Sequence, residues 1–233
     1  MNFALVIPTL NEAENIGPLV DRIRGIETPP TEIIFVDDNS TDGTRERIRS
    51  LRDDAVRLVE RNEPSLGLAG AVIAGARAAH SELLVVMDAD LSHPPEKIAE
   101  LVRPFVAGQA DMVIGSRYIR GATTPGWPIW RKIMSRIAAG AAYPLTHVHD
   151  SMCGFFAIGR DRLLELAPHA TGFKIAFETI VYGRGKLRVL EVPIAFRDRA
   201  RGTSKMSFRV ALRFFARWIS AVLRLLFRRT ARV

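Results

Sequence analysis

Residues 83–95 read LLVVMDADLSHPP, an apolar run that ends in two carboxylates one residue apart. Residues i and i+2 of a strand lie on the same face of a sheet, so Asp88 and Asp90 share a face at the end of this run. Two like charges held side by side repel each other, and a positive group between them removes that repulsion. The stretch therefore predicts a buried strand that ends at a cation, with a divalent metal ion as the first candidate.

Outward from this stretch, short apolar runs alternate with segments of helical spacing. Strands are predicted at 3–10, 33–36, 56–60, 81–91 and 111–118, and helices at 11–26, 43–52, 66–80 and 94–108. Thr41 is expected to cap the second helix, and the glycines of 66–80 indicate close helix packing, since no Gly-Lys-Ser/Thr ending follows them. The alternation predicts a mostly parallel sheet covered by helices on both faces. Ligands of such sheets bind beyond the carboxyl ends of the strands, so PTLNE, DDNSTD and DADLSH should converge on one crevice.

The regular alternation of strands and helices ends at about residue 119. Residues 130–145 predict an amphipathic helix with Arg131, Lys132 and Arg136 on its polar side. A turn, a strand and a helix are expected over 150–166, then a strand over 187–196 and a basic, turn-rich segment. We interpret this region as the second half of one catalytic domain, residues 1–206, that holds an acceptor.

The net charge of +8 is concentrated in the last segment of the chain. Residues 197–233 contain eleven basic residues and one acidic residue, whereas residues 1–196 are nearly neutral. On a helix of 100° per residue, the five arginines between 209 and 228 occupy one arc of about 100°, opposite an apolar face. A transmembrane span requires roughly 18 or more residues with few or no charges, and arginines interrupt this segment too often. Residues 207–233 therefore predict a helix lying in a membrane interface, with docking on the domain or on a partner subunit as the alternative. The apolar face argues against a nucleic-acid partner.

Composition limits the remaining classes. A chain of 233 residues with 48% hydrophobic and 25% charged residues is expected to fold as one large domain. The single cysteine, Cys153, excludes an intramolecular disulfide and fits a reducing compartment. The N-terminus, MNFALVIPTLNEAEN, has no basic region ahead of its apolar run and does not fit a signal peptide.

Three features favour a metal site at the Asp-x-Asp pair, which alone is weak evidence. The pair ends an apolar strand, a second acidic cluster (Asp37, Asp38, Asp42) ends another strand, and basic residues follow downstream. Carboxylates combined with water and phosphate oxygens are typical ligands of Mg²⁺ or Mn²⁺. We therefore expect the two carboxylates to hold a metal that binds a diphosphate. His93, beside the pair, either touches the metal or diphosphate or orients the loop.

The motifs, in their order along the chain, resemble those of the polyprenol-phosphate mannosyltransferases. They are PTLNEAENI, VDDNSTDGT, MDADLSHPPE, GSRY, WPIWRKIMSR, GFKIAFE and EVPIAFRDRARGTSKM. These enzymes are the dolichol-phosphate-mannose synthase group of the family 2 glycosyltransferases, and the likeness runs from residue 3 to residue 206. PTxNE and DxD are shared throughout family 2, whereas the combination with DLSHPPE, RKxxSR and FRDRxxGxSK is far more specific. The resemblance implies a glycosyltransferase-A fold and a metal-dependent, inverting transfer of mannose from GDP-mannose to a polyprenyl, dolichyl-type phosphate.

The resemblance also implies roles for individual residues. The nucleotide pocket would be lined by Pro8, Leu10, Asn11, Glu12, Asp37 and Asn39. The metal would be bound by Asp88 and Asp90, and Ser92 stands where the family usually has a glutamine ligand, so the shorter serine would reach the metal through water. The acceptor phosphate would be held by Arg117, Arg131, Ser135, Arg199 and Lys205. Glu178 matches an acidic position of the family, with no role assigned.

The residue types agree with this chemistry. A lipid phosphate is largely dianionic at neutral pH and is already a nucleophile, so the reaction needs cationic positioning and no general base. An enzyme at the cytoplasmic face of a membrane, with or without a separate anchoring subunit, is the expected setting. A transferase that uses a UDP-sugar is the alternative within the class. A non-catalytic binder of nucleotide sugars or lipid phosphates is the alternative outside it.

Overall fold

The computed structural model describes residues 2–166, 174–183 and 185–198. Within them, seven strands form one sheet in the order β3-β2-β1-β4-β6-β5-β7. The strands are β1 (Ala4–Thr9), β2 (Glu32–Asp37), β3 (Val56–Glu60), β4 (Leu83–Val86), β5 (Met112–Ser116), β6 (Phe156–Gly159) and β7 (Val189–Pro193). The boundary predicted at residue 206 and the helix predicted over 207–233 lie outside the described residues.

Only β6 runs against the other strands of this sheet. β1 pairs in parallel with β2 and β4, β2 with β3, and β5 with β7, whereas β6 is antiparallel to both β4 and β5. The carboxyl ends of β1, β2, β4 and β5 therefore lie at one edge of the sheet. The central strand β4 is completely apolar and buried, and β1 is apolar and buried from Ala4 to Ile7, as strands covered on both faces require. The predicted mostly parallel sheet is confirmed.

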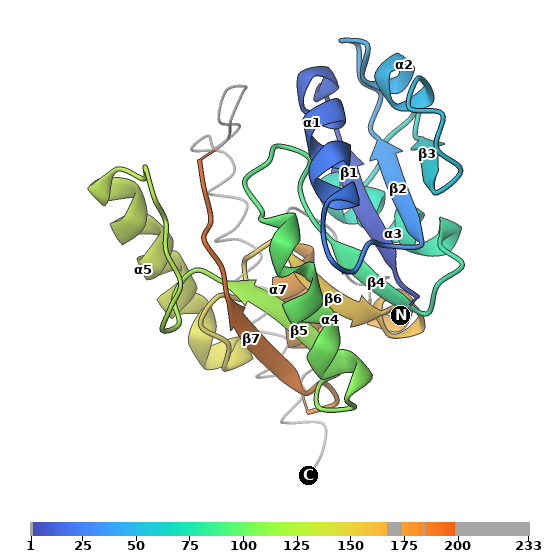
Figure 1. The fold of residues 1–233 in the computed structure, drawn as a ribbon. Coiled ribbons are helices and arrows are strands. Elements are labelled where there is room, and N and C mark those ends of the chain that lie inside the picture. The colour runs from blue at the N-terminus through green and yellow to red at the C-terminus, as the bar shows by residue number, and fades with distance from the viewer. Residues whose placement is uncertain (1, 167–173, 184, 199–233) are drawn as a thin grey trace. The chain divides into compact units, whose positions relative to one another are not determined.

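Helices cover both faces of the sheet. They are α1 (Ala13–Arg24), α2 (Thr44–Arg49), α3 (Gly67–Ala78), the 3₁₀ turn η1 (Pro95–Lys97), α4 (Ile98–Val106), α5 (Ile129–Thr146), α6 (Arg160–Leu166) and α7 (Ile175–Tyr182). Figure 1 shows α1 and α4 in front of the sheet and α3 behind it, where α3 packs on β1 and β2. Among the described residues, no helix combines the length and the apolar character needed to span a bilayer.

The start of α2 differs from the prediction. Thr41 does not cap this helix. The N-cap is Gly43, in the left-handed region at φ 89°, and the carboxylate of Asp42 accepts the backbone N–H of Thr44. An aspartate followed by a glycine provides both the acceptor and the backbone freedom that the turn requires.

The close packing predicted for the glycine-rich helix is confirmed at Gly75. A Cβ atom at this position would lie 2.4 Å from a methyl group of Val6 in β1 and 3.0 Å from one of Val36 in β2. The missing side chain therefore allows α3 to lie directly on the two strands whose carboxyl ends form the crevice.

Replacing Gly75 by alanine should lower the free energy of unfolding by about 1–3 kcal/mol, because the new methyl group overpacks the core. Urea unfolding measures the change. Gly140→Ala is the matched control, since nothing lies within 4 Å of a Cβ built at this helical glycine. It should raise the free energy of unfolding by about 0.5–1 kcal/mol through backbone entropy. Equal stability changes in the two variants would contradict the packing argument.

Candidate active site

The loops after β1 and β2 are joined by hydrogen bonds at the edge of the sheet. The backbone N–H of Asn11 donates to Ser40 Oγ at 2.9 Å, and Asn11 Oδ1 accepts the N–H of Thr41 at 2.9 Å. Asn11 and Asn39 adopt left-handed backbone angles, φ 58° and 63°, which asparagine tolerates better than most residues. The predicted convergence of PTLNE and DDNSTD on one crevice is confirmed.

The second acidic cluster is engaged by protein groups rather than left open. Asp37 is buried and accepts hydrogen bonds from Ser40 and, at 2.5 Å, from Arg45 Nε. Asp38 pairs with Arg61 at 2.7 Å. Burial raises the pKa of Asp38 although the charge of Arg61 opposes this. These carboxylates hold the loop after β2 in place, so they do not add to the metal-binding argument made from sequence.

The Asp-x-Asp pair follows β4 at the same edge. Asp88 is half-buried and lines a small cavity, whereas Asp90 is only 4% exposed and accepts the backbone N–H of Ser92 at 3.1 Å. The hydroxyl of Ser92 is buried and has no hydrogen-bond partner within the described part of the chain. Three oxygen-bearing side chains thus follow one short strand.

His93 orients this loop. Its ring is buried against Phe155, and Nδ1 accepts the backbone N–H of Asp88 at 3.0 Å. Burial lowers the pKa of His93, although the charges of Asp88 and Asp90 oppose the change. A neutral ring that accepts at Nδ1 carries its proton on Nε2, which lies 3.8 Å from the Cys153 sulfur. Of the two roles considered for His93, the geometry favours orienting the loop.

Arg117, the first residue after β5, forms a bidentate pair with Asp150. Its Nε and Nη2 atoms lie 2.7 and 2.8 Å from the two carboxylate oxygens, and its backbone N–H donates to the same carboxylate. The side chains are 10% and 0% exposed. Burial opposes the charged form, but the hydrogen bonds and charge of Asp150 outweigh it and raise the pKa of Arg117. The guanidinium also contacts the rings of Trp127 and Phe196. Sequence reasoning missed Asp150.

The other described acceptor candidates lie on α5. The Arg131 guanidinium lies 4.1 Å from the centre of the Trp127 ring and donates to Asp198 at 2.8 Å. Ser135 accepts a hydrogen bond from the hydroxyl of Tyr118, the residue after Arg117. One tyrosine therefore links the end of β5 to α5 and brings Ser135 close to Arg117. Arg199 and Lys205 lie outside the described residues.

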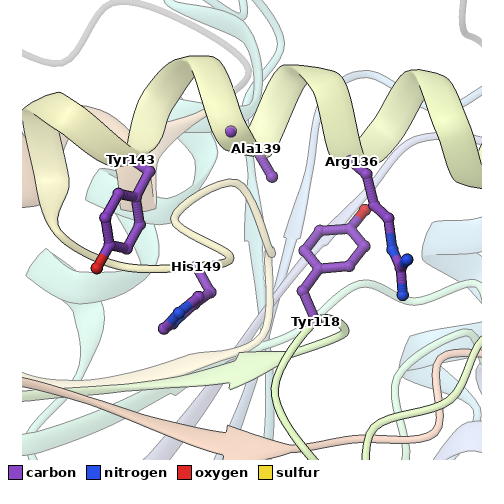
Figure 2. A pocket seen from close by; sticks show the side chains of 6 residues that line it. Tyr118, Arg136, Ala139, Tyr143 and His149 are labelled. Carbon is purple, nitrogen blue, oxygen red and sulfur yellow. The ribbon is translucent and has the colours of Figure 1, made fainter.

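A cavity of about 320 Å³ adjoins this cluster (Figure 2). It lies between α5 and the loop that contains His149, and Tyr118, the residue after Arg117, lines it. Its lining residues are Tyr118, Arg136, Ala139, Gly140, Tyr143 and His149. The walls are mostly aromatic or aliphatic, with the Arg136 guanidinium beside Tyr118.

The apolar face of α5 is exposed. Five large apolar side chains are between 53% and 76% exposed: Ile129, Trp130, Ile133, Met134 and Ile137. At 100° per residue they occupy one arc of about 140°, and Lys132 and Arg136 border it. A contiguous exposed apolar stripe of this kind marks an interaction surface. The helical period was readable from the sequence, but the direction of its apolar side was not.

A second, smaller cavity of about 60 Å³ lies between the ends of β1 and β4. Pro8 and Asp88 line it together with residues 152–154 and with the start of α7, including Lys174. Gly154 is close to the carboxylate, since a Cβ there would lie 3.3 Å from Asp88 Oδ1. Lys174 stands in the motif GFKIAFE, which had indicated only Glu178; Glu178 is buried in α7.

The remaining predicted nucleotide residues lie at the crevice with different exposure. Leu10 is 38% exposed, Asn39 is exposed, and Glu12 is half-buried and accepts the side-chain N–H of Asn15 at 2.7 Å. The crevice therefore has a carboxylate half after β1, β2 and β4, and a cationic half formed by the end of β5 and α5. Such a division is compatible with a site for two substrates, one of them an anion.

Comparisons with known proteins agree with this class. Residues 4–166 match the model of the glycosyl transferase family 2. The chain is 38% identical to the dolichol-phosphate mannosyltransferase of Pyrococcus furiosus over 88% of its own length and 59% of that protein's. It is 37% identical to the protein of that name from Mycosarcoma maydis, covering 91% of this chain and 76% of the relative. The undecaprenyl-phosphate mannosyltransferase of Micrococcus luteus is 36% identical, covering 89% of this chain and 88% of the relative.

The chain therefore belongs to glycosyl transferase family 2, and the resemblance found in its motifs is confirmed. The chain spans about three fifths of the length of the Pyrococcus relative. A crystal structure of glucosyl-3-phosphoglycerate synthase from Mycobacterium tuberculosis, in complex with Mn²⁺, UDP and glucosyl-3-phosphoglycerate, has the same fold. Its TM-score is 0.71 at 21% identity, with 96% of this chain and 79% of that chain covered.

Proposed function

We propose that this glycosyltransferase moves mannose from GDP-mannose to a polyprenyl phosphate, with inversion at the anomeric carbon and with Mg²⁺ or Mn²⁺ as cofactor. The observation that carries the proposal is the division of one crevice between carboxylates after β4 and cations near the end of β5. The names of the relatives supply the sugar and the acceptor class.

The donor half fits a hard divalent cation. Asp88, Asp90 and the unpartnered Ser92 hydroxyl are oxygen donors of the kind that Mg²⁺ and Mn²⁺ prefer. Within the described residues, no cluster of three or more His, Cys, Asp or Glu side chains could hold a metal. Such a cation would therefore complete its coordination with water and the diphosphate of the donor. When bound, it would neutralise charge that develops on the leaving diphosphate.

The acceptor half fits a phosphate monoester. Arg131 and Ser135 face the region of Arg117, and a guanidinium binds two phosphate oxygens at once. Both arginines have a carboxylate partner, but Asp150 beside Arg117 is buried whereas Asp198 beside Arg131 is 49% exposed, so we infer that an acceptor phosphate displaces the partner of Arg131 more readily. A dianionic phosphate is itself the nucleophile and needs no catalytic base. An acceptor oxygen held in line with the donor can attack the anomeric carbon directly.

The cavity in Figure 2 fits the beginning of the acceptor's hydrocarbon chain. Tyr118 lines it, and the hydroxyl of this tyrosine is hydrogen-bonded to Ser135, one of the phosphate-binding candidates. Its aromatic and aliphatic walls suit an isoprenoid rather than a second sugar. The exposed stripe of α5 continues from there and would lie on the membrane that holds the rest of the lipid.

The apolar stripe makes a membrane prediction. Replacing Ile133 and Ile137 together by glutamine in the full chain should weaken binding to vesicles about tenfold, because two side chains no longer enter the lipid. Co-sedimentation with phosphatidylcholine vesicles containing phosphatidylglycerol measures it. Val106→Gln, at a similarly exposed position on α4, is the control and should bind as wild type does. Equal binding by all three proteins would contradict a membrane contact through α5.

The cytoplasmic face as the location, a peripheral attachment and an anchoring subunit belong to this proposal as well. The basic segment 207–233 supports attachment to an anionic surface through its charge and its apolar face. No nucleic-acid partner is proposed, since four of the five exposed side chains of the α5 stripe, Ile129, Ile133, Met134 and Ile137, have no ring on which bases could stack.

A transfer assay tests the function. The full chain is incubated with Mn²⁺ or Mg²⁺, a polyprenyl phosphate and one radiolabelled nucleotide sugar from a panel, and label in the organic phase is counted. Label from GDP-mannose alone is the expected result. Label only from a UDP-sugar would replace the donor and keep the mechanism. No label from any donor, together with direct binding of the nucleotide sugar, would favour a non-catalytic binder.

A further inference from the structure

Lys174 is the one basic residue among the described residues that line the cavity beside Asp88. It stands directly before α7, and its Nζ donates to the carbonyl oxygen of Met152 at 3.2 Å. An ammonium group has three N–H donors, so this bond leaves two for other acceptors. Lys174 lines the cavity together with Pro8, near the carboxyl end of β1, and Gly154, shortly before β6.

The charges around Lys174 come from both halves of the site. Burial lowers the pKa of Lys174 and the charge of Arg117 lowers it further, whereas Asp88 and Asp150 act in the opposite direction. Lys174 forms no ion pair with any described carboxylate, although Asp88 lines the same cavity. Lys174 is half-buried, and a partly desolvated ammonium without a paired counter-ion loses hydration that a structural role alone does not repay. An anionic ligand in the cavity would supply the missing partner.

We infer that Lys174 is a further catalytic residue, whose ammonium contacts the donor's diphosphate beside Asp88 and stabilises the leaving nucleoside diphosphate. The inference rests on the proposed function. In the reaction, the bond from the anomeric carbon to the diphosphate oxygen breaks and its electron pair stays on that oxygen. A phosphate oxygen of the acceptor forms the new bond to the carbon. Lys174 stays protonated throughout, because no proton has to move.

The donor diphosphate is favoured over the acceptor phosphate by the walls of the cavity. Pro8 and Asp88 belong to the carboxylate half, whereas Arg131 and Ser135 of the acceptor half do not line it. A contact to the terminal phosphate of the nucleotide has a specific signature. It strengthens binding of a nucleoside diphosphate and leaves binding of the monophosphate unchanged.

Calorimetric titration with Mn²⁺ tests this signature by comparing GDP with GMP, and UDP with UMP, on wild type and Lys174→Met. The comparison uses the nucleotide pair, guanine or uracil, whose diphosphate binds to the wild-type protein. Lys174→Met should bind that diphosphate about 10- to 100-fold more weakly, the range of one charged hydrogen bond, and the monophosphate within twofold. Its kcat should fall about 100-fold or more, as when one preorganised donor is removed from a developing anion. Lys174→Arg should recover most of the diphosphate affinity.

Lys186→Met is the matched control, since this exposed lysine lies three residues before β7, whose first residues are at the end of the strand away from the crevice. It should bind as wild type does. Equal loss of diphosphate and monophosphate binding, a diphosphate loss below threefold, or equal loss in Lys174→Met and Lys174→Arg would each overturn the inference. If wild type binds neither diphosphate, the proposed function and the role of Lys174 are both wrong. Binding of UDP alone, with the Lys174 signature intact, would overturn only GDP-mannose as the donor.

Discussion

Replacing Asp90 by asparagine should lower the rate of sugar transfer about a thousandfold, the largest loss of activity that we expect from one substitution. Asparagine keeps the oxygen that accepts the N–H of Ser92, so the loop after β4 retains its main internal hydrogen bond. The change removes one negative charge and one carboxylate oxygen from a position that is only 4% exposed. A metal held by two carboxylates and the substrate would then lose half of its protein charge.

Asp161→Asn is the control, since that carboxylate is 87% exposed on α6. The measurements are organic-phase label as a function of Mn²⁺ concentration and the electron paramagnetic resonance signal of Mn²⁺ with nucleotide present. Asp90→Asn should show weakened Mn²⁺ binding as well as lost transfer, with an unchanged thermal midpoint. Retention of more than a tenth of the activity with normal Mn²⁺ dependence would contradict the assignment of Asp90 to the metal.

Replacing Asp150 by alanine should lower the free energy of unfolding by about 3–5 kcal/mol. The substitution leaves the guanidinium of Arg117, 10% exposed, without the carboxylate that accepts both of its side-chain hydrogen bonds. The aromatic contacts of Arg117 with Trp127 and Phe196 do not replace a counter-ion, since a cation over a ring gains only about 1–2 kcal/mol. The expected loss is large because the protein can rehydrate this charge only by disturbing its core.

Asp111→Ala provides a comparison of the same chemistry at the surface. Asp111 pairs with Arg188 at 3.0 Å, but the side chains are 34% and 62% exposed. This variant should lose about 1 kcal/mol or less, because water solvates the released charge. Urea unfolding compares the two, and the double variant Arg117→Met/Asp150→Leu should recover part of the stability that Asp150→Ala loses. A loss in Asp150→Ala no greater than in Asp111→Ala would contradict the importance of burial.

The pairing of Arg117 with Asp150 cannot be predicted from a local sequence pattern. Arg117 was expected to meet an acceptor phosphate because of its motif, but its partner Asp150 lies 33 residues further along the chain. Nothing in the sequence near either residue marks the other. Their meeting requires β5 and the turn before β6 to lie side by side, and that follows from the antiparallel pairing of β5 with β6.

The second acidic cluster shows that a local pattern can also suggest a metal site that the fold does not provide. Asp37 and Asp38 resemble metal ligands in sequence, since they end a strand and carry charge. In the fold, Arg45 and Arg61 reach them from α2 and from the end of β3. The difference from Asp88 is the presence of a nearby guanidinium, which depends on how the next elements pack.

The sequence alone determined the alternation of strands and helices, the carboxylates at the end of β4 and the family to which the chain belongs. These features depend on residue periodicity and on motifs of neighbouring residues, which are local properties of the chain. Only the tertiary structure decided that Asp150 neutralises Arg117, that Lys174 shares a cavity with Asp88, and that α5 exposes its apolar side. The physical reason is that burial and charge pairing depend on which distant segments pack together, and one local pattern is compatible with several such partners.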